Sequence, residues 1–160
     1  ADITVVSWGA MVHRAAEAAA RFGDRVELID LRTIAPWDKA CVLASVAKTG
    51  RCLVVHEDNL TAGFGAEIAA TLAQESFWLL DAPVERLAPK DIPVAYHEAL
   101  LAALMPGVEE IAATPGVGPE IARALGLSES TVNNHLGAIF KQLGVQTKLQ
   151  LRALVDGQGG

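Results

Sequence analysis

The sequence predicts an α/β domain built on a mainly parallel sheet, followed by a small all-α module. Short β-branched runs alternate with helix-forming stretches of about a dozen residues, a pattern typical of parallel strands covered by helices on both faces. Beyond a turn-rich stretch at 115–119 the alternation stops and only helical periodicity remains. These two observations divide the chain into parts of different fold class.

The predicted strands are short apolar and β-branched runs. Residues 3–7 and 26–31 form the first two. The third, at 52–56, is apolar up to its final His56, which indicates burial on both faces of the sheet. We expect a short extended piece at 77–80 and a further strand at 84–87.

Helical stretches separate and follow these strands, at 11–22, 38–48, 66–75, 96–104 and 108–113. Gly23 stands where a left-handed C-cap is expected for the first helix. Asp38 can cap the second through its carboxylate, and Gly50 follows its end. The apolar residues can therefore be buried between the predicted sheet and the helices that cover it.

The residues after Pro119 have the spacing of a helix-turn-helix. Ala122 supplies a small residue where the two helices cross. Gly126, four residues on, tolerates the positive φ of the turn, and Val132 packs back onto the first helix. Ser128 can cap the second helix, whose first turn is then free to meet phosphates.

Composition and charge limit the possible functions. The 160 residues are 51% hydrophobic with a mean hydropathy of +0.30, so the chain can bury a sizeable core. Residues 1–113 carry nine Lys and Arg against sixteen Asp and Glu, whereas residues 114–160 carry four against three. Because duplex binding depends on neutralising phosphates, the acidic first part is not expected to bind nucleic acid, and the second is only weakly basic.

Sequence signals also indicate a cytoplasmic protein. Cys41 and Cys52 form no CxxC pair and are expected to stay reduced. No stretch approaches the length of a membrane span, and the start lacks a signal-peptide pattern. The chain begins directly on a strand without Met, which favours a fragment of a longer polypeptide. It has no P-loop and no G-x-G-x-x-G fingerprint.

Several motifs of the first part occur in a recognisable order: Trp8 with Gly9, DLRT at 30–33, PWD at 36–38, KTGR at 48–51, His56 with Glu57, GFGAEI at 63–68 and DAPV at 81–84. With them, residues 2–113 closely resemble the C-terminal domain of the β subunit of thiamine-dependent 2-oxo acid dehydrogenases, in the transketolase C-terminal domain family. The resemblance implies a three-layer α/β/α domain with a mostly parallel five-stranded sheet. It also implies that this domain assembles subunits while two other domains hold thiamine diphosphate and magnesium, so we assign no catalytic, cofactor-binding or metal-binding residue here.

The carboxyl end of the third strand leaves two interpretations open. His56, Glu57 and Asp58 could serve acid–base or metal chemistry, or form a hydrogen-bonded turn that orients the glycine loop. Phe64, between two glycines that suggest close backbone approach or positive φ, is a plug in its own domain or an anchor in a neighbouring subunit. The resemblance places this loop and the next helix near subunit contacts. The interface candidates are His56, Glu57, Gly63, Phe64, Gly65 and Glu67.

The second part, 119–155, resembles the LuxR-type helix-turn-helix of bacterial response regulators and quorum-sensing activators. The resemblance implies that the helix at 129–143 enters the major groove, and that the final helix forms dimers. The residues that would face DNA are Ser130, Thr131, Asn133 and Asn134. Asn133 stands where the family usually has Lys or Arg. A helical hairpin that packs on the α/β domain or dimerises, without a DNA role, is the alternative.

We therefore expect a transketolase C-terminal-like domain at 1–106, a hinge or shared helix at 107–118, the helix-turn-helix at 119–156 and a frayed tail at 157–160. The first hypothesis is a non-catalytic assembly domain of a 2-oxo acid dehydrogenase β subunit fused to a helix-turn-helix. Its partners would be another copy, the α subunit and the acyltransferase core, with DNA possible through 119–155. The alternatives are a transcriptional regulator with an α/β sensing or dimerisation domain, and an artificial fusion of two fragments.

Overall fold

The computed structural model describes residues 1–114. The helix-turn-helix predicted at 119–156, with Ser130, Thr131, Asn133 and Asn134, lies outside the described residues, as do the tail and the last part of the hinge.

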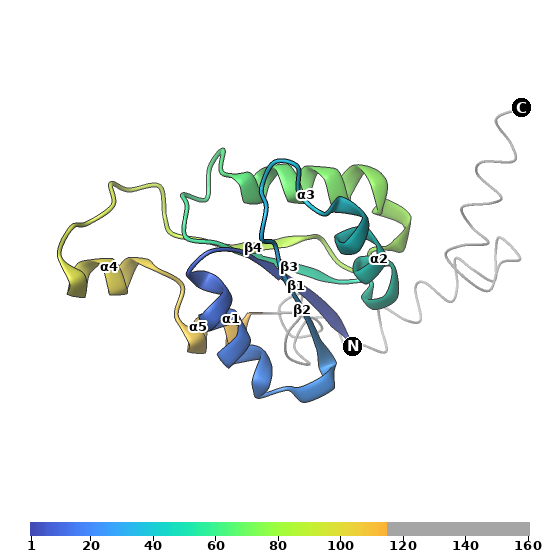
Figure 1. Cartoon of the computed structure of the whole chain (residues 1–160), viewed down its shortest axis with the longest axis horizontal. Helices are drawn as coiled ribbons and strands as arrows, with labels where there is room; N and C mark the ends of the chain where they lie inside the picture. The colour runs from blue at the N-terminus through green and yellow to red at the C-terminus, as the bar shows by residue number, and fades with distance from the viewer. Residues whose placement is uncertain (115–160) are drawn as a thin grey trace, which may run out of the picture. The chain divides into compact units, whose positions relative to one another are not determined.

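The sheet is parallel throughout, as the sequence predicts. Its four strands are β1 (Ile3–Ser7), β2 (Val26–Asp30), β3 (Cys52–Val55) and β4 (Glu85–Leu87). They lie in the order β2-β1-β3-β4, and every neighbouring pair runs parallel (Figure 1). At the centre, Val6 of β1 is in register with Ile29 on one side and Val54 on the other.

The fifth strand implied by the family resemblance is absent from the described part of the chain, where the sheet has four strands. The piece expected to be extended at 77–80 is instead the 3-10 turn η2 (Phe77–Leu79). The backbone amides of Leu79 and Leu80 both donate to the carbonyl of Ser76, at 2.8 and 3.1 Å, so they are taken up locally and join no ladder. The prediction of extended structure there was wrong.

Five helices accompany the sheet in the described residues: α1 (Met11–Ala20), α2 (Lys39–Thr49), α3 (Phe64–Glu75), α4 (Glu98–Leu104) and α5 (Val108–Ala113). The carboxylate of Asp38 accepts a 3.0 Å hydrogen bond from the amide of Cys41, which confirms the predicted cap of α2. Gly50 ends that helix at φ 68°. Gly23 does not cap α1, which ends at Ala20; it lies instead at positive φ in the 3-10 turn η1 (Gly23–Arg25).

Two apolar cores fill the faces of the sheet and give the predicted three layers. Alternate residues of β1 point to opposite faces: Val5 joins the core beneath α1 and α5, and Val6 joins the core beneath α2 and α3. The first core buries Ile3, Val5, Met11, Ala15, Ala18, Leu53, Val55 and Ile111. The second buries Val6, Trp8, Leu31, Val42, Val46, Cys52, Val54, Ile68 and Leu72.

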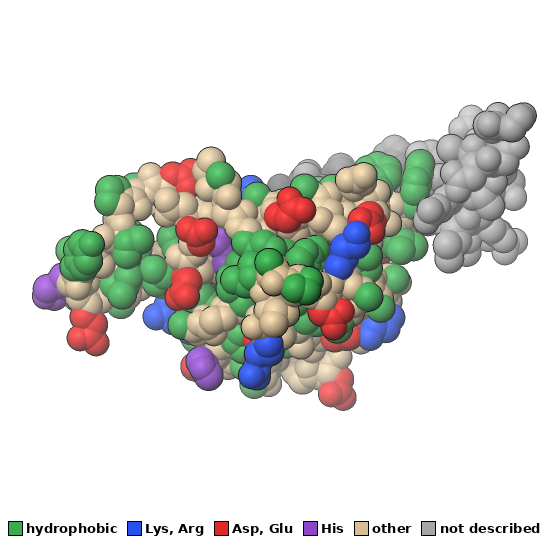
Figure 2. Space-filling view, turned by 45° about the horizontal axis from the view of Figure 1, so that its top comes forward, with side chains coloured by type: hydrophobic (Ala, Val, Ile, Leu, Met, Phe, Trp, Pro, Cys, Tyr) green, Lys and Arg blue, Asp and Glu red, His purple; other side chains and the backbone are tan. Residues whose placement is uncertain are grey.

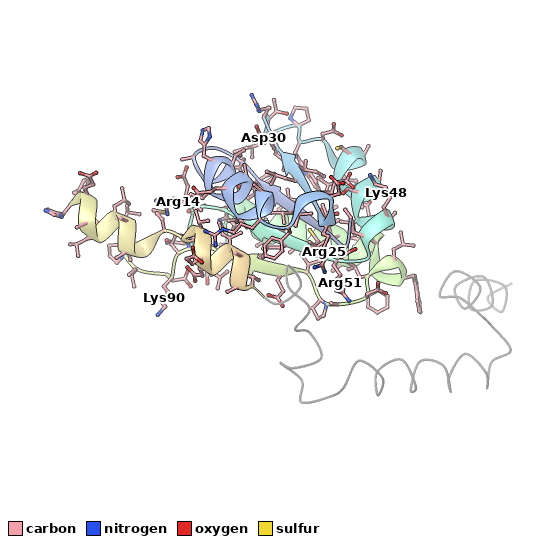
Figure 3. The ribbon with its side chains drawn as sticks, turned by 90° about the horizontal axis from the view of Figure 1, so that it is seen from below. Arg14, Arg25, Asp30, Lys48, Arg51 and Lys90 are labelled. Carbon is pink, nitrogen blue, oxygen red and sulfur yellow. The ribbon has the colours of Figure 1, made fainter. Side chains whose placement is uncertain are left out.

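The short helix α5, expected as a hinge or shared helix, is packed onto α1. Its Ile111 is only 1% exposed in the first core. The guanidinium of Arg14, which extends from α1 (Figure 3), donates to the carbonyl of Pro106 at 2.9 Å, just before the helix begins. Arg21 binds Glu109 through two hydrogen bonds of 2.9 and 2.7 Å. The last described helix is therefore part of the α/β body.

The two cysteines lie where the sequence predicts, Cys41 exposed on α2 and Cys52 buried in β3, and both are free thiols. Burial raises the pKa of the Cys52 thiol to about 12. In the described part of the chain, every helix is too short or too polar to cross a bilayer.

Candidate interface at the carboxyl edge of the sheet

A fully buried histidine organises the carboxyl edge of the sheet. His56 directly follows β3, and its amide donates to the carbonyl of Leu87 at 3.1 Å, beside the end of β4. Its ring stacks on the indole of Trp8, with centroids 5.3 Å apart and 8° between the planes. Neither ring nitrogen has a hydrogen-bond partner among the described residues. The imidazole is therefore held by packing.

Two glycines allow the backbone of the following loop to approach this ring. A Cβ atom on Gly65 would lie 2.4 Å from Nε2 of His56, well inside contact distance. A Cβ atom on Gly63 would lie 2.8 Å from the carbonyl oxygen of Asn59 and 3.4 Å from Cε1 of His56. Gly63 has φ −70°, so close approach rather than positive φ accounts for it. The predicted close backbone approach is thus present at both glycines.

Phe64, between these glycines, is half-buried in an aromatic cluster of its own domain. Its ring meets Trp8 edge-on at 5.1 Å between centroids and Trp37 at 6.1 Å. Phe64 is the first residue of α3 and remains partly exposed there. Packing within the domain is established for Phe64, and contact with another subunit remains a prediction.

The acidic candidates lie at the surface around this cluster. Glu57 and Glu67 are both exposed, the second in the first turn of α3. Asp58 is also exposed, and its carboxylate accepts a 2.8 Å hydrogen bond from the next amide, that of Asn59. No three His, Cys, Asp or Glu side chains of residues 1–114 form a group that could hold a metal ion. The side-chain hydrogen bond described for this motif is the local one at Asp58, and the role of His56, Glu57 and Asp58 stays a prediction.

Contacts to the loop after β4 hold the glycine loop in place. The amide of Leu60 donates to the carbonyl of Pro89 at 3.1 Å, and Arg86 donates to the carbonyl of Leu60 at 2.6 Å. The hydroxyl of Thr61 donates to the carboxylate of Asp91, and the amide of Thr61 donates to it at 2.9 Å. These two hydrogen bonds from Thr61, that of the hydroxyl first, lower the pKa of Asp91. Sequence reasoning missed this pairing, because nothing local at either position signals a contact between loops thirty residues apart.

Acidification is expected to destabilise the domain through His56. Burial lowers the pKa of this imidazole below its ordinary 6.5 and outweighs Asp58, whose charge acts to raise it. The folded domain therefore holds the ring neutral, while the unfolded chain takes up a proton as the pH falls through 6.5. The contribution of neutral His56 to the free energy of unfolding is therefore fully present above pH 6.5. Below that pH the free energy of unfolding falls by up to about 1.4 kcal/mol per pH unit, until the pH reaches the pKa of His56 in the folded state.

The measurement is the thermal unfolding midpoint between about pH 7.5 and about pH 5.5, above the range in which ordinary carboxylates titrate. The midpoint of the wild type should fall across this range, and the fall should shrink in His56→Gln, whose side chain does not titrate. His13→Gln is the matched control, since His13 is exposed on α1. Equal pH dependence of the wild type and His56→Gln would contradict the prediction.

Two family models match the chain in separate stretches. The model described as "Transketolase, C-terminal domain" matches residues 1–111. The model described as "Bacterial regulatory proteins, luxR family" matches residues 118–155. The junction between the two matches coincides with the change of pattern in the sequence.

Curated relatives match the first part of the chain. The 2-oxoisovalerate dehydrogenase subunit beta of Chaetomium thermophilum is 54% identical over 98 residues, covering 58% of this chain and 21% of that protein. The subunit of the same name from Pseudomonas aeruginosa is 42% identical over 113 residues, covering 71% and 32%. The pyruvate dehydrogenase E1 component subunit beta-1 of Arabidopsis thaliana is 43% identical, covering 69% and 31%. The chain spans between 21% and 32% of the length of these three relatives.

A solved structure described as "Split gene transketolase, inactive beta4 tetramer" has a similar fold. The TM-score is 0.59 at 26% sequence identity, and the match covers 70% of this chain and 36% of that one.

Proposed function

The chain belongs to the transketolase C-terminal domain family, and on this basis we propose that its α/β domain assembles the β subunit of the decarboxylating component of a 2-oxo acid dehydrogenase complex, without catalysing a reaction alone. The relatives named as 2-oxoisovalerate and pyruvate dehydrogenase β subunits support this role. The partners in this proposal are a second copy of the chain, the α subunit and the acyltransferase core, in the cytoplasm.

Thiamine diphosphate and magnesium belong, in this proposal, to other domains of the parent enzyme. Residues 1–114 bring together no group of three His, Cys, Asp or Glu side chains suited to a metal ion. No step of thiamine chemistry is assigned to these residues.

The proposal rests on the geometry of the glycine loop and of the first turn of α3, at the carboxyl edge of the sheet. The ring of His56, stacked on Trp8 and against Gly65, fixes the backbone of this edge. Fixing the backbone leaves Glu57, Glu67 and part of Phe64 at the surface in a defined arrangement. A preformed surface loses little conformational entropy when a partner binds, which is what an assembly domain requires.

The test measures assembly and turnover of the full chain. We expect the chain to self-associate in sedimentation velocity, and to release no CO2 from 2-oxoisovalerate or pyruvate when thiamine diphosphate and magnesium are supplied. Glu67→Arg should weaken binding of a partner subunit. Asp24→Arg is the control, because it reverses the charge of an exposed residue on η1, and it should leave that binding unchanged. Turnover by this chain alone, or a chain that associates with neither itself nor an α subunit, would overturn the proposal.

We propose DNA binding through residues 119–155 as a second candidate function. The match of residues 118–155 to the luxR family supports it. Ser130, Thr131, Asn133 and Asn134 are the proposed DNA-facing residues. In this case the chain is a transcriptional regulator, and the α/β domain serves dimerisation or sensing.

A gel-shift titration at two salt concentrations tests the second candidate. Wild type should bind duplex DNA at low salt and lose affinity as salt rises, because binding releases counterions from phosphates. Asn133→Lys should tighten binding and increase the salt dependence by about one released counterion. No shift at low salt, or a shift without salt dependence, would exclude a DNA-binding role of this kind.

A further inference from the structure

The glycine loop, residues 57–63 between β3 and α3, contains a strained residue. Ala62 has a φ of 61°, and it is the one residue other than glycine with a positive φ in the part of the chain that the structure describes. A residue with a Cβ atom disfavours this left-handed conformation, which persists only where the surrounding structure imposes it. Because Ala62 is itself exposed, packing of its own side chain does not impose it. The contacts that do so lie at its neighbours in the chain.

The two residues before the strained one are held by β4 and by the segment that follows it. The amide of Leu60 donates to the carbonyl of Pro89 at 3.1 Å. The amide of Thr61 donates to the carboxylate of Asp91 at 2.9 Å, and the hydroxyl of Thr61 donates to the same carboxylate. The guanidinium of Arg86 donates to the carbonyl of Leu60 at 2.6 Å. We refer to these hydrogen bonds, which join residues 60–61 to residues 86–91, as the clasp.

Both side chains that act in the clasp are charged. Hydrogen bonds to an ionised group are roughly twice as strong as those between neutral groups. The hydrogen bonds from the hydroxyl and the amide of Thr61 do most to lower the pKa of Asp91, and the positive charge of Arg86 lowers it further. On the other side of the strained residue, a Cβ atom on Gly63 would lie 2.8 Å from the carbonyl oxygen of Asn59. The backbone is thus confined on both sides of the strain.

The clasp connects two exposed stretches of the domain. Asp91 lies where the chain leaves the α/β body towards α4 (Figure 1). Hydrophobic side chains gather on the segment that follows it (Figure 2). The glycine loop carries Leu60, which is 36% exposed, and leads directly into Phe64 at the start of α3. The conformation of the loop therefore decides how Leu60 and the start of α3 are presented to a partner.

We propose that Asp91 and Arg86 are positioning residues of the interface, which hold the glycine loop, against the strain at Ala62, in the conformation that a partner subunit binds. The inference rests on the proposed assembly function and names the residues that prepare its interface. When the clasp opens, Ala62 relaxes to a negative φ and the residues before it leave their positions. The partner then binds only the clasped fraction of the chain, so that the apparent dissociation constant rises by the inverse of that fraction.

Hydrogen exchange of the full-length chain, resolved at single amides by NMR, measures the clasp in the absence of any partner. The amides of Leu60 and Thr61 should be protected in the wild type, although both residues are exposed. The Leu60 amide is the decisive readout, because Asp91→Ala leaves its own acceptor at Pro89 in place. Asp91→Ala removes hydrogen bonds to a charged group, each typically a factor of about ten or more, so exchange at Leu60 should rise by at least about tenfold.

Two further variants separate opening of the clasp from a local effect of the substitution. Asp91→Asn keeps an acceptor oxygen for Thr61 and should retain part of the protection at Leu60. Asp24→Ala is the matched control, because it removes an exposed acid on η1, and it should exchange like the wild type. Amides of β1 and β3 report that every variant is folded.

Ala62→Gly tests the strain that the clasp opposes. Glycine adopts a positive φ without steric cost, so the loop should then keep its conformation with fewer contacts. In the double variant Asp91→Ala with Ala62→Gly, exchange at Leu60 should rise less than in Asp91→Ala alone. An equal or larger rise would overturn the role given to strain at Ala62.

Binding of the α subunit, measured by sedimentation velocity, separates this inference from the function on which it rests. Its dissociation constant should rise by at least about threefold in Asp91→Ala, where the open loop outnumbers the clasped one, and should recover in part in the double variant. Unchanged exchange at Leu60 in Asp91→Ala would overturn the clasp, whatever becomes of assembly. Raised exchange with unchanged binding would overturn the positioning role. If exchange rises but the wild type binds no α subunit, the assembly function fails while the clasp against strain stands.

Discussion

Replacing Gly65 by Ala is expected to lower the free energy of unfolding of the α/β domain by about 2–3 kcal/mol, as overpacked cores do. The new Cβ would lie 2.4 Å from Nε2 and 2.5 Å from Cδ2 of His56. That ring cannot easily move aside, because it is completely buried and stacked on Trp8. The better helix propensity of Ala, about 1 kcal/mol, offsets only part of the clash. Chemical denaturation measures the loss.

Gly107→Ala is the matched control for this substitution. Like Gly65, Gly107 lies at the start of a helix and has a negative φ. A Cβ atom on Gly107, however, would meet no atom within 4 Å. It should change stability by less than about 0.5 kcal/mol, as surface substitutions usually do. Removing the ring provides a second check: in the double variant Gly65→Ala with His56→Ala, the combined loss should be smaller than the sum of the single losses. Additive losses would show that the methyl group does not meet the imidazole.

Replacing Ile111 by Ala is expected to cost about 3 kcal/mol of unfolding free energy, in the usual range for deleting a buried Ile side chain. Ile111 is 1% exposed and packs in the core shared by β1, β3 and α1. The loss should appear in the unfolding of the α/β domain itself, although the residue stands near the end of the described chain. Urea denaturation followed by tryptophan fluorescence reports it, since Trp8 is buried directly after β1.

Glu110→Ala is the neighbouring control on the same helix, because Glu110 is exposed. It should stay within about 0.5 kcal/mol of the wild type. If Ile111→Ala lowered the free energy of unfolding as little as Glu110→Ala, α5 would contribute little to the stability of the domain. The α/β domain would then end near residue 106, as the sequence predicts. A large loss would place the end of the α/β domain after α5.

The sheet could be predicted largely from local pattern. The runs containing Val5 and Val54 are mostly β-branched and apolar, and the run containing Ile29 carries Glu27 and Asp30 among its apolar residues. All three form neighbouring parallel strands. The failure at Phe77 and Trp78 has a physical cause. Two adjacent large apolar residues are typical of a strand, but here their rings pack edge-on at 5.2 Å in a turn that is fastened to Ser76. A short apolar run does not reveal which backbone partners it will find.

The candidate site was only partly predictable for a similar reason. The spacing of Gly63 and Gly65 signals close backbone approach, and that approach is present. The sequence does not reveal that the group approached is His56, or that Trp8 stacks on the same ring, because these contacts join segments that follow separate strands. Phe64 shows the same limit, since its contact with Trp37 depends on the path of the chain between β2 and α2.

The packing of α5 on α1 also has a consequence for the order in which the domain can form during synthesis. Ile111 closes a core whose other members include Met11 and Ala15 of the first helix. About a hundred residues separate them from Ile111, which at roughly 5–20 residues per second corresponds to roughly 5–20 seconds of translation. Through that interval one face of the nascent sheet lacks its last covering helix. The ribosome must therefore deliver nearly the whole domain before its first helix is fully buried, and a chain that stalls before residue 108 would expose that face to chaperones and proteases.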